Sequence, residues 1–198
     1  MKQLVLATHN RDKTREISAL LSDIGVEVRT LDAFPQIGRV PEDAGTLEGN
    51  ALLKASAVIR ATGLPSLGDD TGLEVHALYG EPGVYSSRYS GEHATYAENV
   101  AKLIAKMKGF TPRRRAARFR CALAFVAPGM GPRTVEGVCL GTILERPRGT
   151  GGFGYDPVFL PTGYDSTLAE MDLSLKNSIS HRARGMQKML PILREYFK

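Results

Sequence analysis

The stretch that most invites a chemical interpretation places two adjacent carboxylates, Asp69 and Asp70, between Gly68 and the pair Thr71-Gly72. Successive side chains of a strand point to opposite faces. The two carboxylates therefore reach one site only where the strand ends or bends, which the flanking glycines permit. Close carboxylates repel each other unless a cation lies between them or one carries a proton. The stretch indicates a cation site, and the alternative is a solvated turn.

The length and composition of the chain indicate its broad class of protein. At 198 residues, with 42% hydrophobic and 24% charged residues, the chain is typical of a soluble globular protein, and we expect one domain over residues 1–198. Its longest apolar run, residues 121–127, is too short to cross a membrane, and no signal-peptide pattern is present, so we expect a cytoplasmic protein. Cys121 and Cys139 are expected to be reduced core thiols. The net charge of +5 favours an anionic partner.

A second polar group follows the first expected strand, residues 3–7. Asn10 is a suitable N-cap for an amphipathic helix whose apolar face includes Ile17 and Leu21, and Lys13 lies in the first turn of that helix. The free backbone amides and the dipole of such a helix both favour a phosphate. The alternative is a capped helix with a solvated Lys13.

A second strand is expected at residues 26–30 and a second helix at residues 46–62. Asn50 and Lys54 repeat at i, i+4 beside the apolar side of this helix. Lys54 is interpreted either as a solvated helix lysine or as a phosphate contact. The connection before the helix, residues 32–45, carries Glu42.

Residues 148–159 contain four glycines within six positions, which is costly in conformational entropy unless the backbone needs positive φ or a close approach. No Gly-Lys-Ser/Thr follows, so the stretch is not a P-loop, and no βαβ unit supports a dinucleotide fingerprint. Phe153 and Tyr155 among the glycines indicate a base-stacking wall. The alternative is a glycine-rich hairpin turn.

The rest of the chain predicts alternating helices and strands. A capping box at Thr95 opens a helix to about residue 108, and residues 118–127 and 134–144 are expected to pair as strands. A last helix, capped by Ser180, places His181 and Arg182 in its first turn, where cations oppose the dipole; this favours a functional role or a tethering salt bridge. The basic run at residues 113–120 lacks interleaved aromatics, so a solvated loop and strand face is favoured over a nucleic-acid site.

Four stretches together resemble the inosine/xanthosine triphosphate pyrophosphatases, which hydrolyse non-standard purine nucleoside triphosphates. Each motif alone is weak, but the set, its order and its spacing are specific, and the resemblance covers essentially the whole chain. Three positions depart from the family pattern, namely His9, Gly49 and Leu175. The four stretches are Leu6-Ala7-Thr8-His9-Asn10 with Lys13 and Glu16, Asp69-Asp70-Thr71-Gly72-Leu73, Gly152-Phe153-Gly154-Tyr155-Asp156-Pro157, and Ser180-His181-Arg182.

The resemblance implies a mixed α/β fold in which a strongly twisted central sheet with surrounding helices forms two lobes, with a nucleotide cleft between them. It implies a homodimer that uses Mg²⁺ and binds a purine nucleoside triphosphate. From the apolar and basic runs described above, we expect no nucleic-acid or membrane partner. The reaction implied is hydrolysis of ITP, dITP or XTP to the monophosphate and pyrophosphate, which cleanses the nucleotide pool.

The resemblance also implies the roles of individual residues. Asp70 and Lys13 are the expected catalytic residues, and Arg182 with His181 is expected to offer donors to the 6-keto edge of the base. The expected metal ligands are Asp70, Glu42 and Asp69. The expected substrate-binding residues are Thr8, His9, Asn10, Arg11, Asp12, Lys13, Lys54, Thr71, Phe153, Gly154, Tyr155, Asp156, Lys176, His181 and Arg182.

Two alternatives stay open at this point. One is a related pyrophosphatase that acts on modified pyrimidine or standard nucleotides. The other is a non-enzymatic nucleotide- or RNA-binding protein, for which Arg113–Arg115 is the footprint. Mg²⁺-dependent pyrophosphate release separates both enzymes from the binding protein, whereas a steep salt dependence of RNA binding favours the latter.

Overall fold

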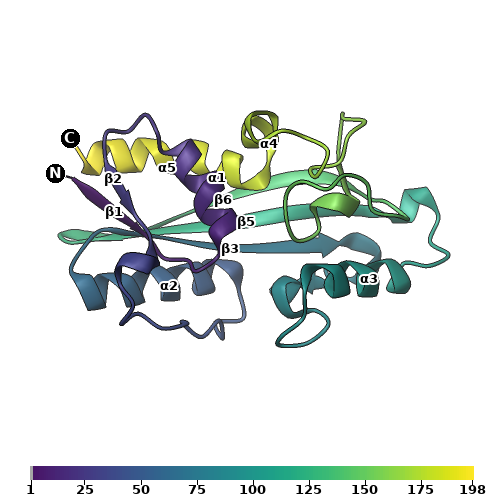
Figure 1. The fold of residues 1–198 in the computed structure, drawn as a ribbon, viewed down its shortest axis with the longest axis horizontal. Helices are drawn as coiled ribbons and strands as arrows, with labels where there is room; N and C mark the ends of the chain where they lie inside the picture. The colour runs from purple at the N-terminus through teal and green to yellow at the C-terminus, as the bar shows by residue number, and fades with distance from the viewer. Residues whose placement is uncertain (1) are drawn as a thin grey trace. The chain divides into compact units, whose positions relative to one another are not determined.

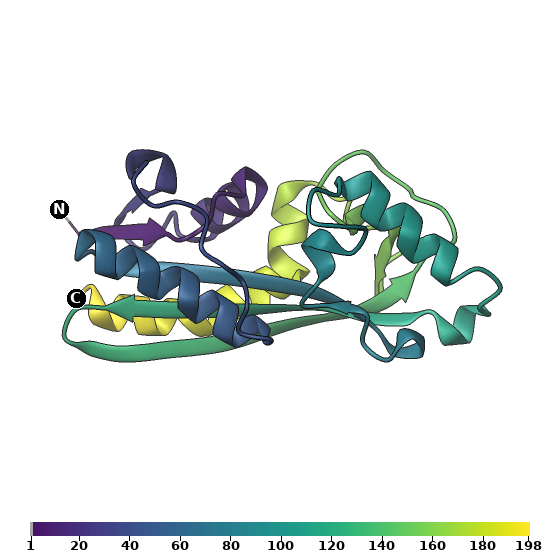
Figure 2. The ribbon, with the colours of Figure 1, turned by 90° about the horizontal axis from the view of Figure 1, so that it is seen from below.

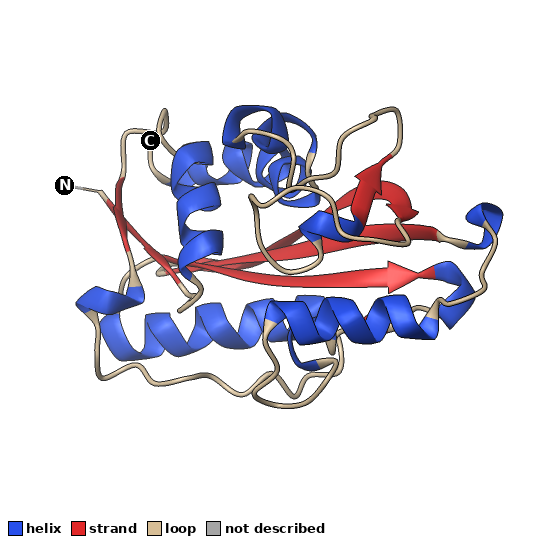
Figure 3. Ribbon diagram, turned by 45° about the vertical axis from the view of Figure 1, so that its right-hand side comes forward, coloured by secondary structure: helices blue, strands red, loops and turns tan. Residues whose placement is uncertain are grey.

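A computed structural model describes residues 2–198, and it has the expected mixed α/β architecture. The strands, drawn red in Figure 3, form one sheet. The strand order is β2-β1-β3-β5-β6-β7, and β4 pairs with β3. The first strand is parallel to both β2 and β3, whereas β4 and β7 pair antiparallel with their neighbours. The elements are β1 Gln3–Leu6, α1 Arg11–Leu20, β2 Glu27–Arg29, α2 Leu47–Thr62, β3 Ser66–Val75, β4 Pro82–Gly83, α3 Tyr96–Lys106, β5 Ala116–Ala127, β6 Met130–Ile143, β7 Phe159–Pro161, α4 Leu173–Ile179 and α5 His181–Tyr196.

The chain divides into two compact units. The first contains Met1–Asp70, Cys121–Gly137 and Arg182–Lys198, and the second contains Thr71–Arg120 and Val138–His181. No helix within residues 2–198 is long and apolar enough to cross a membrane. The single domain over residues 1–198 and the cleft between lobes stay predictions.

The first unit has helices on both sides of its strands. Figure 1 shows α2 on one side and α5 on the other. Leu4 and Leu6 of β1 pack with Ile17 of α1 and Met186 of α5, whereas Val5 belongs to a separate apolar cluster that includes Val58 of α2. This alternation along β1 is typical of a strand that is buried on both faces.

The helices of the first unit begin where the sequence predicts. The Asn10 side chain accepts hydrogen bonds from the amides of Asp12 and Lys13, and the Thr46 hydroxyl accepts one from the amide of Gly49. Both caps satisfy donors that a helix leaves unpaired at its first turn. The expected cap of α1 is therefore confirmed, and Thr46, expected as the first residue of the second helix, is the N-cap of α2.

The alternative of a solvated turn at the paired aspartates is wrong, because both are buried. β3 continues from Ser66 through both aspartates to Val75, so no turn follows at Thr71. Gly68 has a different purpose, because a Cβ at this position would lie 2.1 Å from the carbonyl oxygen of Ala51 in α2. The glycine allows the helix backbone to approach the strand closely.

The second unit is built around its own apolar cluster. Leu73 of β3, Phe119 of β5, Leu103 of α3 and Phe159 of β7 all belong to it. The capping box predicted at Thr95 is present, with Glu98 as its partner. In Figure 2 the teal helix α3 lies beside the green segment that carries residues 145–160.

Two features of the second unit differ from the sequence-based expectation. Arg115 is not part of a solvated basic run: it is 4% exposed and donates to the carbonyls of Met107, Phe110 and Ile143. The short helix α4, capped by Asp172, was not predicted. Its seven residues are too few to show a helical apolar period.

Candidate active site

Asp69 is the centre of a buried ion network in the first unit. It is 1% exposed, and its carboxylate accepts hydrogen bonds from Nε of Arg182 at 2.9 Å and from Sγ of Cys121 at 3.1 Å. Nζ of Lys13 lies 2.5 Å from its other oxygen. Arg182 also donates to Glu16 at 2.5 Å. Two carboxylates thus balance two cations in a region that excludes water.

The charges of this network are mutually stabilised. Burial alone favours neutral Asp69, yet Arg182 and then Lys13 hold the pKa of Asp69 well below its ordinary value of 3.8. Burial likewise opposes the charge on Lys13, but Asp69 and Asp70 outweigh it and raise the pKa of Lys13 above 10.5. Burial, followed by the charge of Asp69, raises the pKa of the Cys121 thiol well above 9.0, so this thiol stays protonated.

Asp70 has different partners from its neighbour. Its carboxylate lies 2.7 Å from Nζ of Lys54 and accepts a hydrogen bond of 3.2 Å from the amide of Asn50. The same Lys54 nitrogen lies 3.0 Å from Oε1 of Glu42. Lys54 is only 8% exposed, so it is not the solvated helix lysine of one interpretation. One lysine therefore joins two carboxylates from different parts of the chain.

The three carboxylates proposed as metal ligands do not converge. Within residues 2–198, no group of three or more His, Cys, Asp or Glu side chains is arranged to hold a metal ion. Glu42 and Asp70 do converge on Lys54. Proteins commonly bind Mg²⁺ through one or two carboxylates, and substrate phosphates and water supply the other ligands. These two fit the ion. The contacts of Asp69 with Arg182, Lys13 and Cys121 argue against its role as a ligand.

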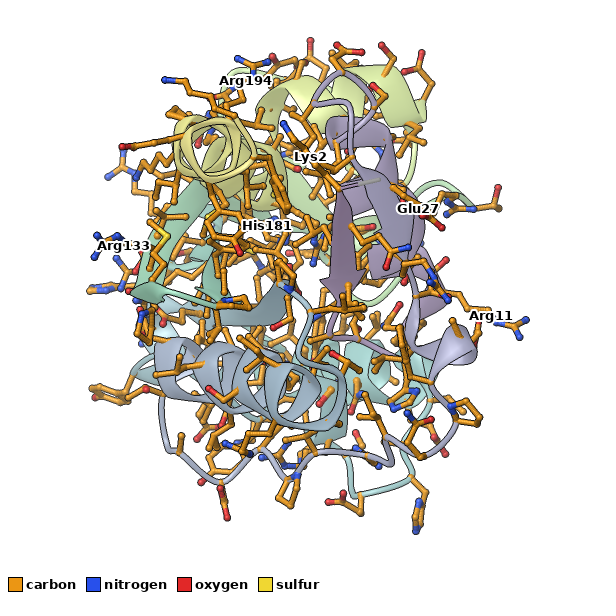
Figure 4. The ribbon with its side chains drawn as sticks, turned by 90° about the vertical axis from the view of Figure 1, so that its left-hand side faces the viewer. Lys2, Arg11, Glu27, Arg133, His181 and Arg194 are labelled. Atoms are coloured by element: carbon orange, nitrogen blue, oxygen red, sulfur yellow. The ribbon has the colours of Figure 1, made fainter. Side chains whose placement is uncertain are left out.

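The loop before α1 holds most of the predicted phosphate-binding group. The amide of Asn10 donates to the Thr8 hydroxyl at 3.1 Å, which fixes the turn between strand and helix. Nε2 of His9 lies 3.4 Å from the carbonyl of Gly38. Arg11 is exposed, and Figure 4 shows its side chain at the margin of the molecule; Asp12 is half-buried.

The glycine-rich segment of the second unit has the backbone that its sequence predicts. Gly149, Gly152 and Gly154 have positive φ values of 83°, 66° and 62°. A Cβ at Gly152 would lie 2.3 Å from a carboxylate oxygen of Asp156, and one at Gly149 would meet the backbone of Ala169. The segment therefore needs glycine both for positive φ and for close approach.

Asp156 organises the predicted base-stacking wall. It is 2% exposed, accepts a hydrogen bond of 2.8 Å from the amide of Phe153, and pairs with the ammonium of Lys176. The same ammonium lies 4.8 Å from the centroid of the Phe153 ring. One carboxylate thus holds both the loop that carries the aromatic ring and the cation over that ring.

Two other predicted site residues of this unit, Tyr155 and His181, are buried against other groups of the protein. Tyr155 is 4% exposed, and its hydroxyl donates to the carbonyl of Ser86 at 3.0 Å. His181 is 3% exposed and stacks on Phe119, with 4.5 Å between the ring centroids; Figure 4 shows it away from the margin of the molecule. Thr71 lies within β3 and is half-buried.

The structure gives Arg182 contacts that argue against the predicted base contact. α5 does begin at His181, so both side chains lie in its first turn. However, Arg182 is 0% exposed, and its donors are directed to Asp69 and Glu16. This is the tethering salt bridge that was the alternative interpretation.

Three residues of these clusters are not among the predicted catalytic, metal-binding or substrate-binding residues. Asn50 had a signal, because it lies one helical turn before Lys54. Glu16 had a signal as an acid beside Ile17 on the buried side of α1, where it is 2% exposed. Cys121 was predicted as a reduced core thiol, and the structure confirms two free, buried cysteines. Its bond to Asp69 joins residues 52 positions apart and leaves no local signal.

Known proteins match this chain over nearly its full length. The family described as the Ham1 family matches residues 4–192. The dITP/XTP pyrophosphatase of Geobacter sulfurreducens is 48% identical over 186 residues, which cover 94% of this chain and 94% of the relative. The dITP/XTP pyrophosphatase of Geobacillus kaustophilus is 48% identical over 189 residues, which cover 96% and 93%.

Solved structures share the fold. A HAM1 protein from Coxiella burnetii has a TM-score of 0.88 at 37% identity, covering 98% of this chain and 100% of that one. The nucleoside-triphosphatase, or dITP/XTP pyrophosphatase, from Mycobacterium abscessus has a TM-score of 0.75 at 40% identity, covering 96% and 99%.

Proposed function

Because this chain belongs to the Ham1 family, we propose that it hydrolyses the non-standard purine nucleotides ITP, dITP and XTP to the monophosphate and pyrophosphate. The observation that carries this proposal is the near full-length identity of 48% with a relative named as a dITP/XTP pyrophosphatase. The cluster of Lys54, Asp70 and half-buried Glu42 supports it, because it supplies a cation for the phosphates and carboxylates for a metal ion and a water molecule.

The carboxylate of Asp70 is the proposed general base. It removes a proton from the attacking water, whose oxygen forms a bond to the α-phosphorus. The bond from that phosphorus to the oxygen bridging to the β-phosphate breaks, and pyrophosphate leaves with the electron pair. The ammonium of Lys54 and the amide of Asn50 fix the orientation of the carboxylate before reaction.

Magnesium is the proposed cofactor, held by Glu42 and Asp70. When bound, Mg²⁺ offsets the negative charge of the triphosphate and orients the leaving group. The chain contributes further positive charge through Lys13 and Lys54. Asp69 is proposed as the residue that positions Lys13, rather than as a ligand of the metal.

Base binding is assigned to the second unit. Phe153 is proposed to stack on the purine, while Asp156 holds its loop and Lys176 neutralises that buried acid. Gly154, Tyr155 and His181 are proposed to line the pocket. Thr8, His9, Asn10, Arg11, Asp12 and Thr71 stay proposed contacts of the phosphates and sugar.

We also propose a homodimer that acts in the cytoplasm, where nucleoside triphosphates are used. The exposed apolar side chains of Tyr79 and Leu140 support an association surface, because they line a hollow of about 590 Å³ in the second unit. Leu140 is 57% exposed although it lies in strand β6. Sedimentation of wild type and Leu140→Glu tests this, with a monomer expected for the variant.

The decisive experiment measures products from ITP, dITP, XTP, GTP and ATP with Mg²⁺. We expect one pyrophosphate per monophosphate for the first three substrates and very little turnover of ATP. Free phosphate without added inorganic pyrophosphatase would exclude the reaction, and a preference for the standard nucleotides GTP or ATP would exclude the substrate class. The matched control omits Mg²⁺ and adds a chelator, which is expected to abolish release.

A further inference from the structure

We propose that Tyr96 is a positioning residue for the ring of Phe153, an inference that rests on the function proposed above. Tyr96 is the first residue of α3. Its ring centroid lies 6.0 Å from that of Phe153, with 43° between the ring planes. This separation is in the range in which tilted aromatic pairs attract each other. Both residues belong to the second unit.

The ring of Phe153 needs support from outside its own segment. The residue lies between Gly152 and Gly154, which both have positive φ and restrict the chain little. Asp156 accepts the hydrogen bond of the Phe153 amide, and this bond fixes the main chain but not the side-chain torsions. Contacts of the ring itself therefore decide its orientation, and these include Lys176 at 4.8 Å and Tyr96.

Tyr96 is well placed to give that support. The capping box of Thr95 and Glu98 fixes the backbone on either side of it, with bonds of 2.7 and 3.2 Å. Further along α3, Val100 and Leu103 are buried in the apolar cluster of the unit and hold the helix in place. A rigid helix thus presents one aromatic ring to another ring that stands on a glycine-rich segment.

Tyr96 contributes little to the core, because 43% of it is exposed. Its removal therefore leaves the fold intact and loosens Phe153. A loosened ring must be ordered when the purine binds, which weakens binding. The phosphate-binding residues of the first unit are untouched, so turnover at saturation is preserved.

The experiment compares steady-state constants of wild type, Tyr96→Ala, Tyr96→Phe, Phe153→Ala and the double variant. We expect Tyr96→Ala to raise KM for ITP about 3- to 10-fold with kcat within twofold, and Tyr96→Phe to restore the wild-type KM. Since Tyr96 acts through Phe153, adding Tyr96→Ala to Phe153→Ala should raise KM no further. Tyr85→Ala is the matched control, because Tyr85 is 59% exposed and its ring lies under Arg88.

A second measurement separates this inference from the proposed function. The chain has no tryptophan, so Phe153→Trp introduces a single fluorescent reporter. Without any nucleotide, adding Tyr96→Ala to this variant should lower the anisotropy of Trp emission and increase acrylamide quenching. Unchanged fluorescence, or an unchanged KM in active Tyr96→Ala, overturns the inference. Absence of pyrophosphate release from wild type overturns the proposed function while the fluorescence result still decides the ring contact.

Discussion

Asp69 and Asp70 are neighbours in β3, yet their carboxylates have separate partners: Asp69 is bound by Arg182 at 2.9 Å and Asp70 by Lys54 at 2.7 Å. The separation follows from the continuous strand, which directs successive side chains to opposite faces. Asp69 is enclosed by two cations and a thiol, whereas Asp70 shares its lysine with Glu42. The two carboxylates therefore belong to separate clusters, and only Asp70 is proposed to act in the reaction.

The first prediction is that Asp70→Asn folds and loses activity. The amide keeps the shape of the carboxylate but cannot remove a proton from water, so kcat should fall about 10²–10⁴-fold. Steady-state turnover of ITP measures this, and the midpoint of urea unfolding checks the fold. A kcat within threefold of wild type at saturating Mg²⁺ contradicts the role of Asp70.

The second prediction is that Asp69→Asn acts mainly on stability. It removes the Asp69 carboxylate from both Lys13 and Arg182, and it leaves Arg182 paired with Glu16 in a buried region. Removing one partner of a buried ion pair typically costs about 3–5 kcal/mol. Urea unfolding should show a much lower midpoint than for Asp70→Asn. Equal midpoints for the two variants would show that the network does not stabilise the fold.

The third prediction concerns the pH dependence of stability. The pKa of Asp69 is lowered in the folded protein, so its contribution is complete above its ordinary pKa of 3.8 and is lost as pH falls through the folded value. The pKa of Lys13 is raised, so its contribution is complete below 10.5 and is lost as pH rises through its folded value. Thermal unfolding of wild type should therefore have a plateau between about pH 5 and pH 10 from this network.

Asp69→Asn is the control for that profile, because it removes the acidic partner. We expect the variant to show a smaller loss of melting temperature between pH 5 and pH 3 than wild type. Identical slopes in this range would assign acid unfolding to other carboxylates, such as Glu170, whose pKa is lowered to about 2, chiefly by Arg148.

Local features of this fold were predictable and long-range pairings were not. Asn10, Thr46 and Thr95 cap the helices that their sequences predict, because a cap depends on residues two or three positions away. The pairing of Arg182 with Asp69 joins positions 113 residues apart, and nothing in either stretch specifies the other. The sequence offered a base contact or a tether for Arg182, and packing of α5 in the first unit favours the tether.

The paired aspartates are a second case in which a contact between distant parts of the chain could not be predicted from the sequence. Gly68 and Gly72 permit a bend, but they also permit close packing, and the sequence does not distinguish the two uses. The position of α2 decides between them, since its Ala51 carbonyl occupies the space beside Gly68. A tertiary contact thus determined whether the two carboxylates face one site or two.

The last prediction tests that contact through Gly68→Ala. The added Cβ would lie 2.1 Å from the Ala51 carbonyl oxygen and 3.2 Å from the amide nitrogen of Ala55. Because these are backbone atoms of α2, the helix itself must move, which costs about 1–3 kcal/mol or more. That shift also displaces Asn50 and Lys54, which hold Asp70. We therefore expect a lower unfolding midpoint together with a lower kcat.

Gly131→Ala is the matched control, since Gly131 also lies in a strand but has no atom within 4 Å of its added Cβ. Urea unfolding and ITP turnover of this variant should stay close to wild type. If Gly68→Ala matched it in both measurements, the close approach of α2 to β3 would not be what holds Asp70 in place. If only the midpoint fell, α2 would support the strand without controlling the orientation of its carboxylate.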